Sequence, residues 1–526
     1  MSLAKKCYRP LSDLLQGLLA NNQCPEVSVS GIAIDSRAVR AGDCFIGLKG
    51  TMTDGAHYIE QSIASGAVAV LVDRATEVKI NQAEIAVPVL YIKNLSAMVS
   101  EIAGRFYGLP SQQLKIAAFT GTNGKTTCTQ LYTQLMAKVT VDGEEVNPAY
   151  IGTTGYAAAK SKLKNKPEAA FENNYSSHQL TTPDAVSAQR ILAELLNSGS
   201  QYIAMEASSH SLDQHRLAAV DIDAAVFTNL SRDHLDYHQT IENYAAAKAS
   251  LFAMPSVKTA VINFDDAVGQ QIIAQLRADI TLLTFSLDNK AADIYCTDIA
   301  ISASGISALV KTPWGSGKLE SSLLGEFNLG NLLAVVAVAC AQGAELDECL
   351  QVLPELRSVT GRMELVSSEM QPRVVVDYAH TPDALEKALL ALKSHCKGKL
   401  WVVFGCGGNR DSGKREQMGK IAVQYADRVV VTNDNPRFEA PEKIAQQIIK
   451  GIETDVDVEL DRRRAIATCI IQAEKQDIVL IAGKGHENYQ IIENNRIAFS
   501  DQEEALAALK TAQLNSTVSI EGGGVK

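Results

Sequence analysis

Short apolar runs alternate with amphipathic segments along most of the chain. From Lys115 onward, a first series of runs rich in Val, Ile and Ala predicts buried strands at residues 115–119, 202–206, 224–228 and 259–263. A second series follows the sequence GRME and predicts strands at residues 373–377, 400–404, 428–431 and 478–482. Most of these runs precede a helical pattern, which is typical of parallel sheets covered by helices. The pattern therefore predicts an α/β fold.

The chain of 526 residues is long enough for about three domains of ordinary size. The residues before Leu109 and Pro110 contain shorter apolar runs, which indicate a separate α/β unit. The longest apolar run, 332–341, is too short to cross a membrane and predicts a core helix. We predict an N-terminal, a central and a C-terminal domain over residues 1–109, 110–355 and 356–526.

Charge and cysteine usage exclude some classes of protein. The formal net charge of −11 argues against sequence-independent binding of nucleic acid, because such binding needs a basic surface that displaces counterions. The ten cysteines are scattered singly, as is typical of thiols kept reduced in a cytoplasm. The N-terminal stretch lacks a clear small-residue cleavage site. We expect a cytoplasmic monomer that binds neither nucleic acid nor a membrane.

The stretch AFTGTNGKTT (118–127) stands between a predicted strand and a predicted helix. Its glycines, Gly121 and Gly124, would let the backbone N–H groups turn inward, and the helix N-terminus adds partial positive charge. Lys125 would reach the outer phosphates of a nucleotide, and the Thr126 hydroxyl suits Mg²⁺. The first glycine of the P-loop pattern is missing, and a glycine turn with an unrelated lysine is the alternative. The strand–loop–helix context favours a nucleotide loop made of Gly121, Thr122, Asn123, Gly124, Lys125, Thr126 and Thr127.

Two polar clusters follow the next strands, MEASSHSLDQHR (205–216) and TNLSRDHLDYH (228–238). Glu206 and His234, from these two clusters, could meet over the phosphates and hold a metal ion. A hydrogen-bonded or capping role is the commoner explanation for a single histidine, but two clusters on successive strand ends favour the metal. Lys248 lies on an otherwise apolar helix face, where the ordinary explanation is that its ammonium extends to solvent.

The stretch TNDNPRFE (432–439) follows an apolar run and lies on a predicted loop, because Pro436 ends regular strand pairing. Loops at this place carry ligand sites in open α/β folds. These residues alone favour a plain turn, in which Asp434 and Asn435 cap the next helix and Arg437 is solvated.

The motifs of the whole chain, taken in order, resemble those of the Mur ligases: TGTNGKTT, MEASSH, NLSRDHLDYH, FNLGN, GRME, VVDYAHTPDAL, GCGGNRD, DNPR and GKGHE. The combination is similar to the branch that adds meso-diaminopimelate to UDP-N-acetylmuramoyl-L-alanyl-D-glutamate, with ATP and Mg²⁺, through an acyl phosphate. The resemblance implies three domains: one that holds the UDP end, a central P-loop ATPase and a C-terminal Rossmann-like domain. The stretches 140–147 and 157–178 match no family motif.

The resemblance also implies roles for individual residues. The implied catalytic residues are Lys125, Glu206, His234 and Lys248. The implied Mg²⁺ ligands are Thr126, Glu206, His234 and a carbamylated Lys248. The residues around the rest of the ATP are Asn328, Arg362 and Asp377.

For the two other substrates the resemblance implies a further set. The UDP end would meet Ser36, with Thr51 and Thr53 nearby. The muramoyl-dipeptide would meet Thr181, Thr182, Ser208, Gln214 and Arg216. The amino acid would meet Arg410, Asp434, Asn435, Pro436, Arg437, Gly483 and Glu487.

Within this resemblance the plain turn at the DNPR loop is no longer favoured. Arg437 could pair bidentately with the distal carboxylate that diaminopimelate has and lysine lacks. Two alternatives stay open. One is a sister ligase of the same fold, including folylpolyglutamate synthetase, which the DNPR loop disfavours. The other is a nucleotide-binding module without chemistry, which the presence of Glu206, His234 and Lys248 disfavours.

Overall fold

The computed structural model describes residues 8–19, 24–50, 53–80, 85–159, 180–366 and 372–521, with side chains described up to residue 513. The chain forms two compact units. Unit 1 comprises Met1–Phe285 and Ala334–Glu345, and unit 2 comprises Ser286–Leu333 and Leu346–Lys526.

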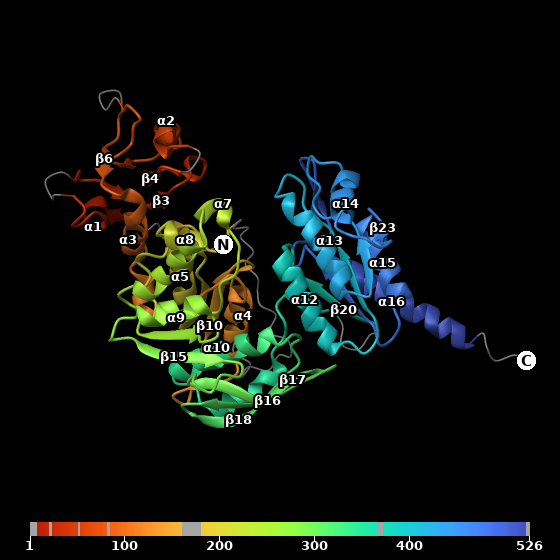
Figure 1. The fold of residues 1–526 in the computed structure, drawn as a ribbon. Helices are drawn as coiled ribbons and strands as arrows, with labels where there is room; N and C mark the ends of the chain where they lie inside the picture. Colours follow the sequence, from red (N-terminus) through yellow and green to blue (C-terminus); the bar gives the residue numbers. More distant parts are fainter. Residues whose placement is uncertain are drawn as a thin grey trace, which may run out of the picture. The chain divides into compact units, whose positions relative to one another are not determined.

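Unit 1 begins with a small parallel sheet (Figure 1). Its strands, in spatial order, are β3 (Gly31–Ala33), β4 (Asp43–Gly47), β5 (Ala69–Asp73) and β6 (Val89–Ile92). Alternate side chains of these strands point to opposite faces, so α3 (Leu95–Tyr107) packs on one face and α2 (Ile59–Ala64) on the other. The short elements around them are β1 (Arg9–Pro10), α1 (Leu11–Leu14), β2 (Ser28–Val29), η2 (Ser36–Ala38) and η3 (Gly55–Tyr58). The α/β pattern predicted before residue 109 is confirmed.

The larger sheet of unit 1 carries the strand ends that matter for the site. Its strands run in the order β11 (Gly155–Ala158), β10 (Pro148–Gly152), β12 (Tyr202–Glu206), β7 (Lys115–Thr120), β13 (Ala224–Phe227), β14 (Thr259–Asn263) and β15 (Thr281–Ser286). All neighbouring pairs from β10 to β15 are parallel, and only β11 is antiparallel. Because β12, β7 and β13 are neighbours, the loops after them meet at one edge. The four strands predicted for this series are confirmed, whereas β10, β11 and β15 were not predicted.

Helices cover this sheet and complete the core. They are α4 (Lys125–Met136), α5 (Ala185–Asn197), α6 (Ser209–Asp213), α7 (Leu235–His238), α8 (Ile241–Ala249) and α9 (Ala267–Ala274). Apolar side chains of α5, including Ile191 and Leu192, pack against Ile116 and Ile203 of the sheet. The helix predicted after the glycine loop, from Thr126 to Lys138, is confirmed as α4, which begins one residue earlier, at Lys125.

Unit 2 contains an antiparallel group and a second parallel sheet. The antiparallel strands are β16 (Ile294–Ser302), β17 (Gly305–Thr312) and β18 (Gly315–Ser321). The second sheet has the order β19 (Glu364–Leu365), β20 (Arg373–Asp377), β24 (Ile478–Ala482), β21 (Leu400–Phe404), β22 (Arg428–Val431) and β23 (Asp457–Val458). All its neighbouring pairs are parallel except β19 with β20. The second predicted series of strands is therefore confirmed as β20, β21, β22 and β24.

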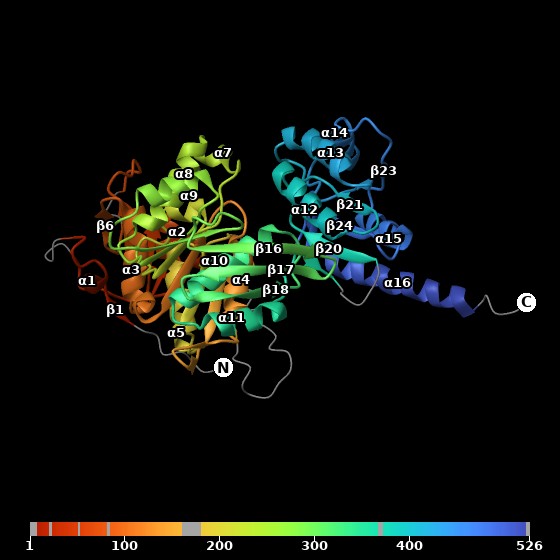
Figure 2. The same ribbon diagram turned by 60° about the horizontal axis from the view of Figure 1, so that its bottom comes forward.

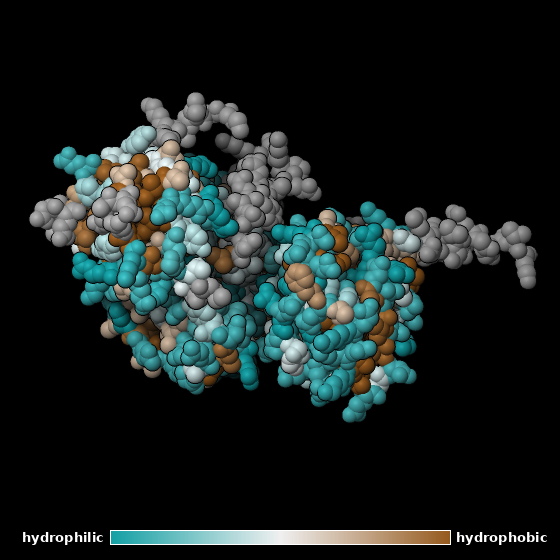
Figure 3. Space-filling view, turned by 90° about the horizontal axis from the view of Figure 1, so that it is seen from above, coloured by the Kyte–Doolittle hydropathy of each residue, from teal (hydrophilic) through white to brown (hydrophobic). Residues whose placement is uncertain are grey.

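Both faces of the second sheet are covered, as Figure 2 shows. One face packs against α12 (Pro382–His395), α13 (Gly413–Tyr425) and α14 (Pro441–Ile449). The other face packs against α15 (Arg462–Gln472) and α16 (Asp501–Glu521). A hairpin of β25 (Tyr489–Ile492) and β26 (Asn495–Ala498) follows β24. Hydrophilic residues predominate on the face of this sheet domain that Figure 3 shows.

The apolar run 332–341 lies within α10 (Phe327–Ala341) and is buried over residues 332–340, which confirms the predicted core helix, and α11 (Leu346–Val352) follows it. Among the helices that the structure describes, none combines the length and the apolar character needed to cross a membrane. The described cysteines are free thiols.

Candidate active site

The glycine loop after β7 is shaped by two positive backbone angles. Gly121 has φ +149° and Gly124 has φ +91°, and a Cβ on Gly121 would lie 2.0 Å from Thr228 Oγ1. The end of β13 holds the loop, because Thr228 Oγ1 donates to the Asn123 carbonyl at 2.6 Å and Asn229 Oδ1 accepts from the Asn123 N–H at 3.0 Å. Sequence reasoning missed Thr228 and Asn229 as supports of this loop. Only their place after the adjacent strand could have indicated them.

Two lysines converge on one carbonyl of this loop. Lys125 Nζ donates to Gly121 O at 2.8 Å and to Thr122 O at 3.0 Å, and Lys248 Nζ donates to Gly121 O at 2.7 Å. Lys248 is 1% exposed, so the expectation that its ammonium extends to solvent is wrong. Its Nζ lies 4.4 Å from the ring centre of Tyr244. Burial, and then the charge of Lys125, lower the pKa of Lys248 well below its usual value.

Glu206, the last residue of β12, is buried against hydroxyl groups. Its Oε2 accepts from Thr126 Oγ1 and from Thr153 Oγ1, each at 3.0 Å, and its Oε1 accepts from the Thr153 N–H at 2.8 Å. A Cβ on Gly152 would lie 2.1 Å from Glu206 Oε1, so the close approach requires glycine there. The structure thus brings the predicted pair Thr126 and Glu206 together. Sequence reasoning missed Gly152 and Thr153, and the GTTG run was the available signal.

His234 lies in a cluster of rings beside this loop. It has φ +53°, and its ring centre lies 4.9 Å from that of His210 and 6.0 Å from that of Tyr244. Burial is the main cause that lowers the pKa of His234, and burial lowers the pKa of the unpredicted His210 to about 4. Among the described residues, no three His, Cys, Asp or Glu side chains form a group that could hold a metal ion. A metal site at Glu206 and His234 therefore stays a prediction.

Four residues predicted for the muramoyl-dipeptide form one hydrogen-bonded group in unit 1. Arg216 donates to Thr182 O at 2.9 Å and to Gln214 Oε1 at 3.0 Å. Thr182 Oγ1 accepts from the Ser208 N–H at 3.1 Å and donates to Glu206 O at 2.9 Å. The group is thereby attached to the strand end that carries the buried carboxylate.

The remaining predicted substrate residues of unit 1 lie apart from this group or outside the description. Ser36 is buried and donates to Gln61 Oε1 at 3.0 Å. Thr181 adjoins the dipeptide group, and Thr127 lies on the first turn of α4. Thr51 and most of the stretch 157–178 lie outside the described residues. The stretch 140–147 forms the hairpin of β8 (Thr140–Val141) and β9 (Glu144–Glu145).

Unit 2 holds the three residues predicted for the rest of the nucleotide. Arg362 and Asp377 lie around one turn, where Arg362 Cζ is 4.5 Å from the ring centre of Tyr378 and Asp377 Oδ2 accepts from the Met363 N–H at 2.7 Å. Burial raises the pKa of Asp377, and the charge of Arg362 opposes this shift. Asn328 is buried on the first turn of α10 and makes its hydrogen bonds within that region.

The loops after β22 and β24 bring charged side chains together. Asn435 Nδ2 donates to Glu487 Oε2 at 2.9 Å. Lys484, which is 0% exposed, lies 3.1 Å from Asn435 Oδ1 and 3.5 Å from both Asp434 Oδ1 and Glu487 Oε2. Within the described part of the chain, the buried Asp434 Oδ1 accepts no hydrogen bond. Lys484 was missed as a site residue, although it belongs to the GKGHE motif.

The DNPR loop is not a plain helix-capping turn. The N-cap of α14 is Ala440, without a side-chain cap, and Asp434, Asn435 and Pro436 are buried, so that alternative is wrong. Arg437 has φ +53° and donates from Nη1 to Gly408 O at 2.9 Å.

The other two residues predicted for the amino acid adjoin this loop. A Cβ on Gly407 would lie 2.9 Å from Arg437 Nη1 and 3.7 Å from Arg410 Cγ, so the two arginines flank one glycine. Gly483 has φ +118°, and a Cβ there would lie 3.8 Å from the Asp434 carboxyl group. The structure therefore gathers the predicted amino-acid residues at neighbouring strand-end loops of one sheet.

Three family models match successive parts of the chain. They are the catalytic domain of the Mur ligase family over residues 28–107, the Mur ligase middle domain over 119–339, and the Mur ligase glutamate ligase domain over 361–485. These matches agree with the α/β sheets described above and with the predicted three-domain Mur ligase fold.

Individual proteins match over nearly the whole chain. The UDP-N-acetylmuramoyl-L-alanyl-D-glutamate–2,6-diaminopimelate ligase of Coxiella burnetii is 44% identical, over 92% of this chain and 96% of its own. The ligase of the same name from Pseudomonas aeruginosa is also 44% identical, with the same coverage of both chains. A solved structure of a ligase with this name has a TM-score of 0.68 and 36% identity, and the match covers 96% of this chain and 100% of that chain. This chain belongs to the Mur ligase family.

Proposed function

We propose that this chain is an ATP-dependent ligase that joins meso-diaminopimelate to UDP-N-acetylmuramoyl-L-alanyl-D-glutamate, a step in the synthesis of peptidoglycan precursors. The observation that carries the proposal is the group of the buried Asp434, Asn435 and Lys484 with the partly buried Glu487 beside Arg437, which offers both signs of charge to a ligand. The name and the 44% identity of the curated relatives support the choice of substrates.

The first step makes the substrate carboxylate reactive. A carboxylate oxygen attacks the γ-phosphorus of ATP, the bond to the bridging oxygen breaks, and ADP leaves an acyl phosphate behind. Two anions must approach each other, so positive groups are needed. Lys125 and the N-terminus of α4 supply them next to the glycine loop, where Gly121 and Gly124 allow the tight backbone turn.

A magnesium ion would fit the oxygen donors beside this loop. The Thr126 hydroxyl and the Glu206 carboxylate lie 3.0 Å apart, and Mg²⁺ prefers hard oxygen ligands. When bound, the ion would neutralise charge on the phosphates. We retain His234 as a further ligand in the proposal, because it lies on the loop after the adjacent strand β13.

Lys248 is proposed to carry a carbamate. Its neutral amine would attack CO₂, forming a C–N bond and releasing a proton, which converts a cation into an anionic ligand for the metal. The lowered pKa supports this, because only the unprotonated amine is nucleophilic. The group of Thr182, Ser208, Gln214 and Arg216 would hold the dipeptide next to this centre.

The second step forms the amide bond. The amine of the amino acid attacks the acyl carbon, and phosphate leaves from the tetrahedral intermediate with its bonding electron pair. No protein nucleophile is required, so the amino-acid residues serve to bind and orient. Arg437 would pair with the distal carboxylate, and Asp434 with Glu487 would accept the distal ammonium hydrogens, with Arg410 completing the site. The buried Asp434 Oδ1 has acceptor capacity available for this within the described residues.

We propose domains over residues 1–109, 110–355 and 356–526, and the separate family matches support this division. Ser36 is proposed to contact the UDP end, while Asn328, Arg362 and Asp377 are proposed to contact the nucleotide. A cytoplasmic monomer completes the proposal, and the free described thiols support a reducing compartment.

The test is ligation with purified protein. ATP and UDP-N-acetylmuramoyl-L-alanyl-D-glutamate are combined with meso-diaminopimelate, L-lysine or no amino acid, and both phosphate release and product mass are measured. We expect product with meso-diaminopimelate only. Lys125→Ala should lose on the order of a hundredfold or more in turnover, because it removes charge stabilisation at the phosphoryl group. Lys258→Ala, in which the replaced side chain is 72% exposed, is the control. Equal use of L-lysine, or normal turnover by Lys125→Ala, would overturn the proposal.

A further inference from the structure

Three consecutive arginines open α15, and only the first of them is buried. The side chain of Arg462 is 0% exposed, whereas those of Arg463 and Arg464 are 67% and 71% exposed. Burying a guanidinium is costly unless it is paired and fully hydrogen-bonded. The position of Arg462 therefore calls for an explanation that its two neighbours do not need.

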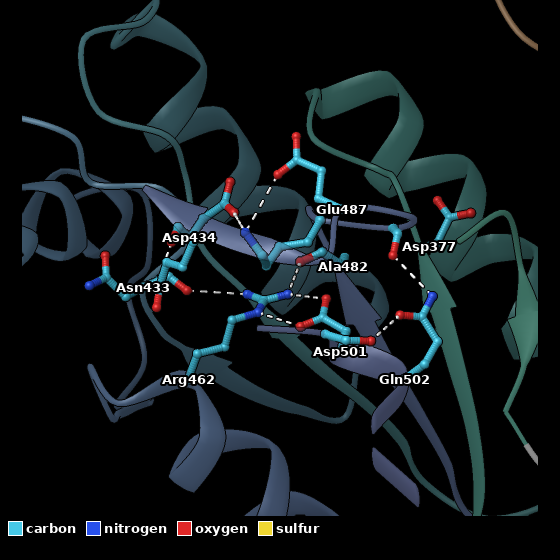
Figure 4. Close-up of polar contacts among 12 residues, drawn as sticks. Asp377, Asn433, Asp434, Arg462, Ala482, Glu487, Asp501 and Gln502 are labelled. Atoms are coloured by element: carbon cyan, nitrogen blue, oxygen red, sulfur yellow. Dashed lines mark hydrogen bonds and ion pairs between the residues drawn. The ribbon is translucent and has the colours of Figure 1, made fainter. Parts of the chain in front are cut away.

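Arg462 is held by a buried carboxylate and reaches two backbone carbonyls (Figure 4). Its Nε and Nη2 donate to the two carboxylate oxygens of Asp501, each at 2.7 Å, and Asp501 is also 0% exposed. Nη2 donates in addition to Ala482 O at 3.0 Å, and Nη1 donates to Asn433 O at 3.3 Å. One guanidinium thus joins three partners from different parts of the sequence.

The two carbonyls lie at the start of the two loops of the amino-acid site. Asn433 directly precedes Asp434, and Ala482 is the last residue of β24, directly before Gly483. Strands β22 and β24 are not neighbours, because β21 lies between them. Two strand spacings amount to roughly 10 Å, so no ladder hydrogen bond fixes the distance between these two loops. Arg462 joins the two strand ends directly, through Asn433 O and Ala482 O.

Further contacts act on the same two loops. Lys484 connects the loops through Asn435 and Asp434, as described above. Gln502, next to Asp501, donates to Gly485 O at 3.0 Å. The N-termini of α15 and α16 therefore both anchor the loop that follows β24.

We propose that Arg462, oriented by Asp501, is a positioning residue that sets the separation of the loops 432–439 and 483–487. The separation determines whether Asp434, Arg437 and Glu487 can engage one distal amino-carboxylate centre together. This inference rests on the proposed function for its choice of ligand. Arg462 would thus contribute to selectivity for an amino acid with a second amino-carboxylate centre without contacting that ligand.

Two different variants test the proposal, so that the result does not depend on whether any single variant folds. Arg462→Lys keeps a cation beside Asp501 but lacks the planar fork that reaches both carbonyls. Arg462→Met/Asp501→Leu removes both charges, because replacing a whole buried ion pair by apolar residues is often neutral for stability. Arg464→Lys and Arg464→Met are the matched controls on the exposed side of the same helix.

Ligation kinetics give the first readout. In both Arg462 variants we expect the KM for meso-diaminopimelate to rise on the order of ten- to hundredfold, because small misplacements of binding groups have effects of this size. The KM for ATP should stay within about twofold, and the preference for meso-diaminopimelate over L-lysine should fall. Both controls should match wild type. If Arg462 and Asp501 only stabilised the fold, a double variant with the melting temperature of wild type would keep the wild-type KM for meso-diaminopimelate. It would also keep the wild-type preference over L-lysine.

Hydrogen–deuterium exchange of the ligand-free proteins gives a second readout that does not depend on the substrate. We expect residues 432–439 and 483–487 to exchange faster in Arg462→Lys than in Arg464→Lys. Unchanged exchange in these segments would overturn the proposal. Wild-type protein that ligates no diaminopimelate would overturn the proposed function instead, and the exchange comparison would still decide whether Arg462 positions the loops.

Discussion

Lys248 in unit 1 and Lys484 in unit 2 are both buried lysines, with exposed fractions of 1% and 0%, yet their surroundings differ. Lys248 Nζ meets the carbonyl of Gly121 and the face of Tyr244. Within the described residues, no carboxylate oxygen lies within ion-pair distance of it. Lys484 lies 3.5 Å from each of two carboxylates and 3.1 Å from an amide oxygen.

The difference shows that burial alone does not decide what a lysine does. The amine of Lys248 loses hydration on burial, which disfavours its charged form. At Lys248 a second cation, Lys125, adds to this effect, and the pKa falls well below its usual value. At Lys484 two carboxylates and an amide oxygen face the buried ammonium group. We infer that the uncompensated lysine is available for chemistry, whereas the compensated lysine organises the residues around it.

The largest expected effect comes from removing the uncompensated lysine. Lys248→Ala should reduce phosphate release by on the order of a thousandfold, because it removes the proposed carbamate next to the phosphates. Short-chain carboxylates added to the buffer should restore part of the activity, since they can occupy the vacated space. Turnover measured with increasing acetate checks both statements. Full activity of Lys248→Ala without added carboxylate would show that Lys248 has no role in the chemistry. Lys258→Ala is the control.

The second effect concerns stability and separates the two lysines directly. Lys484→Met leaves two carboxylates without their buried cation, and we expect a loss of about 3 kcal/mol in the free energy of unfolding. Lys248→Met replaces a side chain that, among the described residues, has no carboxylate oxygen within ion-pair distance, so it should not reduce that free energy. Urea unfolding of the two variants measures the contrast, with Lys475→Met, an exposed position, as the control. Equal losses in the two variants would show that burial, and not compensation, decides the outcome.

The sequence predicted the strands of both sheets that carry the motifs because apolar runs and parallel pairing are local signals. The resemblance to the Mur ligases, and not the residues alone, predicted Thr126 with Glu206 and the gathering of Asp434, Asn435 and Glu487. The structure brings these residues together because the carboxyl ends of parallel strands meet at one edge. The sequence did not predict Thr153 beside Glu206, since the GTTG run indicates a turn but does not show which carboxylate its hydroxyl reaches on another strand. Arg462 illustrates the same point, because in a run of three arginines only the tertiary contact with Asp501 distinguishes one of them.

The third effect concerns the ligand that the compensated site would bind. Arg437→Ala should raise the KM for meso-diaminopimelate by roughly thirtyfold, since a charged hydrogen bond to the distal carboxylate contributes about 2 kcal/mol. The KM for ATP should not change, because Arg437 lies on the amino-acid loop. Initial rates at varied substrate concentrations give both constants. If Arg437→Ala keeps the wild-type preference for meso-diaminopimelate over L-lysine, Arg437 does not bind the distal carboxylate.

The smallest expected effect concerns a second buried cation of unit 2 that is paired with a carboxylate, and it tests whether such pairs stabilise the fold. Arg415 is 1% exposed and donates to both carboxylate oxygens of Glu439, at 2.8 and 3.1 Å. The hydrogen bonds from Arg415 are the main cause that lowers the pKa of Glu439 to about 2. Glu439 is partly exposed and screened by solvent, so Glu439→Gln should cost only about 1–2 kcal/mol of unfolding free energy at pH 7.

The pH dependence of this effect has a defined sign. The folded pKa of Glu439, about 2, lies below the ordinary value of 4.5, so its contribution is complete above pH 4.5 and is lost as the pH falls towards 2. The stability difference between wild type and Glu439→Gln should be constant from pH 7 to 5 and narrow below pH 4.5. Urea unfolding midpoints across this range measure it, with the exposed Glu442→Gln as the control. A difference that does not narrow on acidification would mean that the Arg415–Glu439 contact does not depend on charge. In that case the carboxylate of Glu439 would not be the reason why Arg415 is buried, because shape and packing would explain its burial equally well.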